Sequence, residues 1–127
     1  MTFARRVFRG AAIYGLIALL PMYFLEAEQG RQFPPPITHP EFYYGFVGVA
    51  VAWQLAFLVI ATDPIRYRPL MLAGVVEKLG YGLATVILFA LGRVHPMVLG
   101  TGAIDLTLGA LFVLAYRSTG TAAASQG

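Results

Sequence analysis

The sequence predicts an all-α membrane protein built as an antiparallel bundle of four transmembrane helices. Of its 127 residues, 58% are hydrophobic and only 12% are charged, which lies outside the composition of ordinary soluble domains. The apolar residues form successive runs of about 20 residues, the length that a helix needs to cross the hydrocarbon core of a bilayer. The links between the later runs are short, and short links make neighbouring helices antiparallel.

The first run, residues 7–27, follows a start that is rich in arginine. A positively charged start before an apolar run is also the pattern of a signal peptide. This run is long, however, Pro21 interrupts it, and no small-residue cleavage site follows it. We therefore expect a transmembrane helix that is kinked near Pro21.

A polar connector with three consecutive prolines, Pro34 to Pro36, separates the first run from the second, residues 41–61. Consecutive prolines favour an extended segment and supply no helix. Thr38 is predicted to be the N-cap of the second helix. Pro40 suits its first turn, and Glu41 stands at the position that completes a capping box.

The third span, residues 69–92, begins at a proline that follows the turn signal Asp63-Pro64. The fourth span, residues 96–116, also begins at a proline, directly after the tight link at Val94-His95. The remaining segment, residues 118–127, is small and polar, and we expect a disordered cytoplasmic tail.

The distribution of arginines predicts the orientation of the bundle. Positive residues favour the cytoplasmic side of a membrane, and one end of the predicted bundle collects six arginines while the other has two. We therefore expect a multi-pass protein with both termini in the cytoplasm. Five of the six, Arg5, Arg6, Arg9, Arg66 and Arg68, are also candidates for contact with anionic lipid head groups. The six are Arg5, Arg6, Arg9, Arg66, Arg68 and Arg117, and the two are Arg31 and Arg93.

Polar side chains inside the spans are the best candidates for a site, because they cost free energy in hydrocarbon unless neighbouring helices supply partners. At about 1.5 Å of rise per residue, each predicted helix places one at a similar depth. The third helix carries two of them side by side. The set is Tyr14, Gln54, Glu77, Lys78 and Asp105, with Tyr81 one turn beyond Glu77.

The charges of this cluster predict its pairing. Adjacent residues on a helix point about 100° apart, so we expect Glu77 and Lys78 to look for partners on other helices. Lys78 is predicted to reach Asp105, while Glu77 faces Gln54, Tyr14 or Tyr81. Two acids and one base leave one carboxyl in excess, either protonated or bound to a further group. The cluster then either fixes helix packing or handles a proton, a cation or a ligand.

Several kinds of site lack the residues that they need. The absence of cysteine excludes disulfides, thiolate catalysis and cysteine-based metal sites. The two histidines, His39 and His95, are weak metal candidates, because neither belongs to a metal-binding motif. No cofactor is predicted. No basic stripe interleaved with aromatic residues points to nucleic acid.

Residues 39–82, HPEFYYGFVGVAVAWQLAFLVIATDPIRYRPLMLAGVVEKLGYG, are followed by D-x-x-x-G-A-L-F-x-x-A-Y at residues 105–116. This pattern resembles small bacterial four-helix membrane proteins, and the general plan is similar to the broad DoxX-like group. The shared features are four spans, a short cytoplasmic link and an acid late in the bundle. The resemblance implies an inner-membrane bundle and no particular activity.

The expected function is that of a non-catalytic accessory or scaffold subunit, which packs in the lipid bilayer against itself or another membrane protein. Size is the reason, since four helices with tight loops leave little room for an enclosed site. The alternative is a protein that handles a small molecule, a lipid or protons through Glu77, Lys78 and Asp105. A membrane enzyme ranks third, because no catalytic constellation stands outside that cluster.

Overall fold

The computed structural model describes residues 2–126, and within this range the chain is all-α, as predicted, with no strand. Four stretches are long and apolar enough to cross a membrane: Thr2–Phe24, Pro40–Thr62, Arg68–Ala90 and Pro96–Thr121. The predicted number of spans is therefore confirmed by length and composition. The elements in chain order are α1 (Thr2–Leu19), the 3-10 helix η1 (Leu20–Phe24), α2 (Glu26–Gln32), α3 (Pro40–Thr62), α4 (Arg68–Ala90) and α5 (Pro96–Gln126).

The first span changes helix type at Pro21. α1 ends at Leu19 and η1 carries the chain on to Phe24, because proline has no backbone N–H for the α-helical pattern. The short helix α2 then occupies part of the connector, which the sequence did not predict. Its first turn is acidic and its last turn contains Arg31, the arrangement that suits a helix dipole. The three prolines after it are non-helical, as expected.

Two local predictions are wrong. The N-cap of α3 is His39 and not Thr38, and it makes no side-chain capping hydrogen bond. The segment 118–126, predicted to be disordered, continues α5 as a helix; residue 127 lies outside the described range. Arg68 from the start of α4 holds this part of α5, since its Nε donates to the Tyr116 carbonyl at 3.0 Å and its guanidinium lies 3.6 Å from the centroid of the Tyr116 ring.

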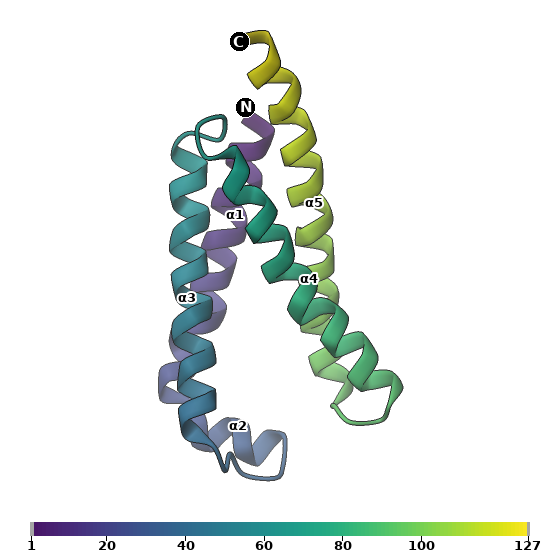
Figure 1. Cartoon of the computed structure of the whole chain (residues 1–127). Helices are drawn as coiled ribbons and strands as arrows, with labels where there is room; N and C mark the ends of the chain where they lie inside the picture. The colour runs from purple at the N-terminus through teal and green to yellow at the C-terminus, as the bar shows by residue number, and fades with distance from the viewer. Residues whose placement is uncertain (1, 127) are drawn as a thin grey trace.

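The helices pack as two close pairs, α1 with α3 and α4 with α5, and the two chain ends lie at the same end of the molecule (Figure 1). Arg5 Nε donates to the Ala61 carbonyl at 3.1 Å, so the start of α1 lies beside the end of α3. At the opposite end, the Tyr43 hydroxyl donates to the Met22 carbonyl at 2.6 Å. α3 and α4 contact each other much less than the helices within each pair.

The apolar core lies toward the end of the molecule that holds the termini. Each span contributes at least one large buried side chain to it: Phe8 from α1, Phe57 and Ile60 from α3, Met71 from α4 and Phe112 from α5. Phe8 stacks on Phe112 with ring centroids 4.2 Å apart, and Phe57 meets Phe112 edge-on at 4.9 Å. From this core α4 diverges from α3 toward the other end (Figure 1), and this divergence creates the candidate site.

Candidate functional site

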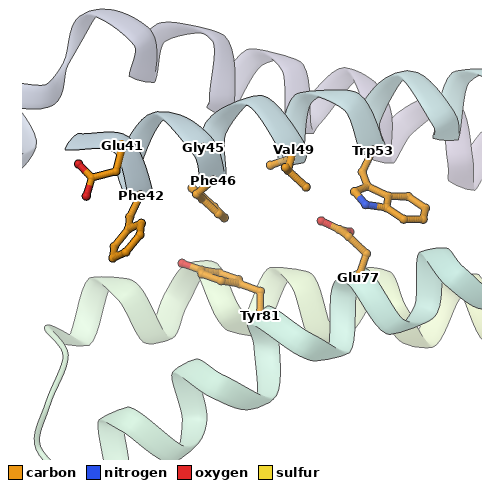
Figure 2. Close-up of a pocket in the computed structure, with 9 residues that line it drawn as sticks. Glu41, Phe42, Gly45, Phe46, Val49, Trp53, Glu77 and Tyr81 are labelled. Carbon is orange, nitrogen blue, oxygen red and sulfur yellow. The ribbon is translucent and has the colours of Figure 1, made fainter. Parts of the chain in front are cut away.

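An open groove of about 560 Å³ lies between α3 and α4 (Figure 2). Its α3 wall extends from Glu41 to Trp53, which is roughly 18 Å along a helix at 1.5 Å per residue. The two helices are joined at the turn after Thr62 and diverge from there, so the inner end of the groove lies at Trp53 and Glu77. The other residues of the α3 wall are Phe42, Gly45, Phe46, Val49 and Ala50.

The α4 wall consists of Glu77 and, one turn later, Tyr81. The Tyr81 ring lies roughly parallel to that of Phe46 on α3, with centroids 6.3 Å apart. Its hydroxyl shares a hydrogen bond of 2.7 Å with Thr101 Oγ1 on α5. Tyr81 is therefore fixed from behind by α5 while its ring faces the groove.

Lys78 lies behind the groove, between two carboxylates. Its Nζ is 3.5 Å from Glu77 Oε2 and 3.7 Å from Asp105 Oδ1, and the residue is only 3% exposed. The predicted contact between Lys78 and Asp105 is confirmed. Glu77 and Lys78 also make an ionic contact, because the flexible lysine side chain brings its ammonium within reach of both acids, but this contact does not satisfy the Glu77 carboxylate.

Glu77 still keeps one oxygen without a hydrogen bond. Its Oε2 is buried and has no hydrogen-bond partner among the described residues, since 3.5 Å to Lys78 is an ionic contact too long for a good hydrogen bond. Figure 2 shows this carboxylate directed from α4 toward α3, into the space between Val49 and Trp53. The apolar groove therefore has one anionic group at its inner end.

The other predicted partners of Glu77 are engaged elsewhere or lie at the surface. Gln54 is buried, and its amide nitrogen donates at 2.9 Å to the Ala50 carbonyl of its own helix. It packs over Gly15 of α1, where a Cβ would collide with its amide oxygen. Tyr14 is 38% exposed on α1. The structure thus brings together Glu77, Lys78 and Asp105 out of the predicted cluster.

The histidines have neighbours that explain their places without a ligand. His39 Nδ1 lies 3.2 Å from Glu41 Oε1, and His95 Nδ1 accepts a hydrogen bond of 3.1 Å from the Met97 N–H. His95 also meets the edge of Phe33, with ring centroids 5.2 Å apart. Among the described residues, no group of three His, Asp or Glu side chains could hold a metal ion.

The candidate head-group arginines divide into two groups. Arg5 and Arg68 donate to backbone carbonyls of neighbouring helices and so connect elements of the fold. The other three, Arg6, Arg9 and Arg66, are exposed near the same end of the molecule. Contact between these three and lipid head groups stays a prediction.

The sequence-based reasoning missed the groove itself. Its signal is a stripe of large side chains on α3, at Phe42, Phe46, Val49 and Trp53. These positions follow the spacing i, i+4, i+7 and i+11 that places residues on one helix face. On α4 the pair Glu77 and Tyr81 follows the spacing i, i+4. In an apolar span, a groove wall and a lipid-facing helix surface have the same sequence pattern. The groove therefore becomes visible only when the structure shows that the two helices diverge.

Comparisons were made with protein-family models, curated proteins and solved structures, and none of them matches this chain. The similarity to the DoxX-like group therefore stays a prediction.

Proposed function

We propose that this protein is a small multi-pass membrane protein that takes an amphipathic small molecule from the bilayer into the α3–α4 groove. The observation that carries this proposal is the Glu77 carboxylate, which lines the inner end of an apolar groove and whose Oε2 has no hydrogen-bond partner among the described residues. A buried polar atom without a hydrogen bond costs about 1–3 kcal/mol. A bound molecule that offers a hydrogen-bond donor or a positive charge removes that cost.

The size and the walls of the groove support a small-molecule ligand. A volume of about 560 Å³ lies in the range of about 300–1,000 Å³ that is usual for small-molecule sites. Such sites combine mostly apolar walls with a few polar groups, as the aromatic and aliphatic lining does here with Glu77. Because the helices around the groove are apolar enough to lie in a membrane, a ligand would enter sideways from the lipid.

Filling the groove tests this function. A side chain at Gly45 would enter the groove, and a Cβ there meets no atom within 4 Å, so Gly45→Leu should fold normally. Gly100→Leu on α5 is the matched control, because its Cβ is equally free and lies outside the groove. We expect native mass spectrometry of the protein, released from its membrane, to detect a small bound molecule on wild type and Gly100→Leu and none on Gly45→Leu. Equal binding to all three, or none to wild type, would overturn the proposal.

An accessory or scaffold subunit is the second candidate. The observation that favours it is the same opening, since Gly45 leaves space for the close approach of a helix from a partner protein. In this case wild type would purify from detergent-free membrane discs with a partner of fixed stoichiometry. Gly45→Leu would lose this partner, while Gly100→Leu would keep it.

For the arrangement in the membrane, we propose an antiparallel four-span bundle in the bacterial inner membrane with both termini cytoplasmic. The pairing of the helices supports it: the start of α1 is bonded to the end of α3 through Arg5, and the start of α4 to the last third of α5 through Arg68. The excess of arginines at the end that holds the termini supports the orientation.

A further inference from the structure

The charges around the groove have a single sign. The two lining residues that carry charge are Glu41 and Glu77, and no lysine, arginine or histidine lies among the described lining residues. Lys78 lies behind the wall, where it is shared between Glu77 and Asp105. Two carboxylates against one ammonium leave one carboxyl in excess, and Glu77 is the member of that set that lines the groove and is directed into it.

The walls next to this carboxylate are aromatic. Phe46 and Tyr81 lie on opposite sides of the groove with ring centroids 6.3 Å apart, and Trp53 lies beside Glu77 (Figure 2). Aromatic faces attract a cation that comes within about 6 Å of the ring centroid, and tryptophan does so most strongly. The effect grows when water is excluded. A carboxylate flanked by rings is the combination that holds an organic cation.

We propose that the α3–α4 groove binds a lipophilic cation, meaning an ammonium or similar onium group carried on an apolar body. The Glu77 carboxylate is the counter-ion, and the rings of Phe46, Trp53 and Tyr81 surround the charged centre. The apolar part of the ligand lies along Val49 and Phe42 toward the outer end of the groove. This inference rests on the proposed function and adds the charge of the ligand to it.

The other occupants fit the observed charges less well. An anion would meet two carboxylates, and a neutral hydrocarbon would give the Glu77 carboxylate no partner in the groove. A second copy of the chain has no free cation to offer at this depth. Lys78 is its only lysine and is itself 3% exposed, while its arginines lie in the first three turns of α1, in α2, in the links between the spans, at the start of α4 and in the last third of α5.

The chain contains its own reporter for this test. Trp53 is the only tryptophan and lines the groove, so its fluorescence should change when a ligand binds there. The probe is tetraphenylphosphonium, added to the full-length protein in lipid nanodiscs. The controls are tetraphenylborate, which has similar size and opposite charge, and triphenylphosphine oxide, which is neutral. We expect a saturable change with the phosphonium alone, and no saturable change with either control compound.

Variants connect this signal to the site. Glu77→Gln keeps the shape of the side chain and should weaken phosphonium binding about ten-fold or more, because it removes the counter-ion. Glu28→Gln on α2 changes an acid outside the groove and should leave binding unchanged. Phe46→Leu removes one exposed ring at little risk to folding, and it should weaken phosphonium binding even if Glu77→Gln does not fold. Gly45→Leu should abolish the signal, and Gly100→Leu should retain it.

The outcomes separate the ligand class from the proposed function. The neutral compound could bind saturably and as tightly as the phosphonium, with binding blocked by Gly45→Leu and unchanged in Glu77→Gln. That result would overturn the proposal that the ligand is a cation, but the groove would remain a binding site. If none of the three compounds binds, and Gly45→Leu does not change the native mass spectrum, both proposals are overturned. A dimer that Gly45→Leu converts to monomer, with no phosphonium binding, would show that a second copy fills the groove.

Discussion

Lys78 holds an unusual position among the individual residues. It is the only lysine of the chain, it lies at the centre of a span, and its Nζ contacts one carboxylate on its own helix and one on α5. Its ammonium also lies 5.3 Å from the centroid of the Phe57 ring, at the edge of the apolar core. A cation at this place separates two partly buried acids that would otherwise repel each other, so it stabilises the α4–α5 pair.

Removal of this cation should therefore be costly. We expect Lys78→Met to lower the free energy of unfolding by up to about 3–5 kcal/mol, the cost of breaking a fully buried pair, because two partly buried carboxylates lose their partner. Asp105→Asn added to Lys78→Met should recover part of this loss, since one of the two unpaired acids becomes neutral. Denaturation in detergent, followed by the helical circular dichroism signal, measures all the variants of the cycle. If the two substitutions cost the sum of the single effects, Lys78 and Asp105 are not coupled.

A predicted contact between two residues is confirmed where their depth along the bundle is enough to bring them together. The rise of a helix places Lys78 and Asp105 at the same level, and this was enough to pair them. The contact between Lys78 and Glu77 depends on how the long lysine side chain bends, which helix geometry does not determine. The environment of Gln54 was equally hidden, because its amide bonds to the Ala50 carbonyl one turn earlier.

Among the elements, the four long helices were predictable and the helices at their margins were not. Apolar runs bounded by prolines mark α3, α4 and the start of α5 in the sequence itself. α2 depends on pairs that a pattern of hydrophobicity does not detect, namely Glu28 with Arg31 and Glu28 with Gln32. The far end of α5 is held by Arg68, 48 residues away from Tyr116, so its order is a product of the tertiary fold.

The close approach of α4 and α5 depends on two glycines, one on each helix. A Cβ at Gly82 would lie 2.6 Å from Leu106 Cγ, and a Cβ at Gly102 would collide with the Thr85 hydroxyl. Thr85 is buried, and its Oγ1 donates to the Gly82 carbonyl at 2.8 Å. Small residues that admit a neighbouring helix are typical of helix contacts in membranes, and here they bring Asp105 within reach of Lys78.

A methyl group at this contact should separate the helices. We expect Gly102→Ala to lower the free energy of unfolding by about 1–3 kcal/mol, the usual cost of an overpacked interface. Gly100→Ala, two residues earlier on the same helix, is the control, since its Cβ meets nothing within 4 Å. Its effect should be neutral or a gain of up to about 1 kcal/mol. Thermal unfolding of the two variants side by side gives the comparison, and equal stabilities would contradict this account of the interface.

The whole molecule is a wedge in which packing and the candidate site occupy opposite ends. The aromatic core joins all four spans near the termini, and the ion cluster of Glu77, Lys78 and Asp105 separates this core from the open groove. The sequence does not indicate this division, because α3 and α4 are apolar on nearly all sides. The angle between them follows from many small contacts around Phe57, Gly74 and Phe112, and no single motif encodes it.

The distribution of arginines predicts the orientation of the wedge in the membrane. This orientation decides on which side of the membrane the groove opens. Six of the arginines lie toward the termini and two toward the opposite end, so from the positive-inside rule we expect the termini in the cytoplasm and the open end of the groove on the outer side. The natural chain has no cysteine, which makes single-cysteine labelling direct. Gln32→Cys lies in the connector before α3, and Ser125→Cys lies beyond the fourth span.

A membrane-impermeant maleimide added to intact spheroplasts should label Gln32→Cys at once and Ser125→Cys only after the membrane is permeabilised. The cysteine-free wild type gives the background. Labelling of Ser125→Cys alone would show that the bundle is inverted and that the groove opens toward the cytoplasm. The proposed topology has one span before Gln32 and four before Ser125, so the two positions should lie on opposite sides of the membrane. Labelling of both variants before permeabilisation would place them on the same side and would contradict this topology.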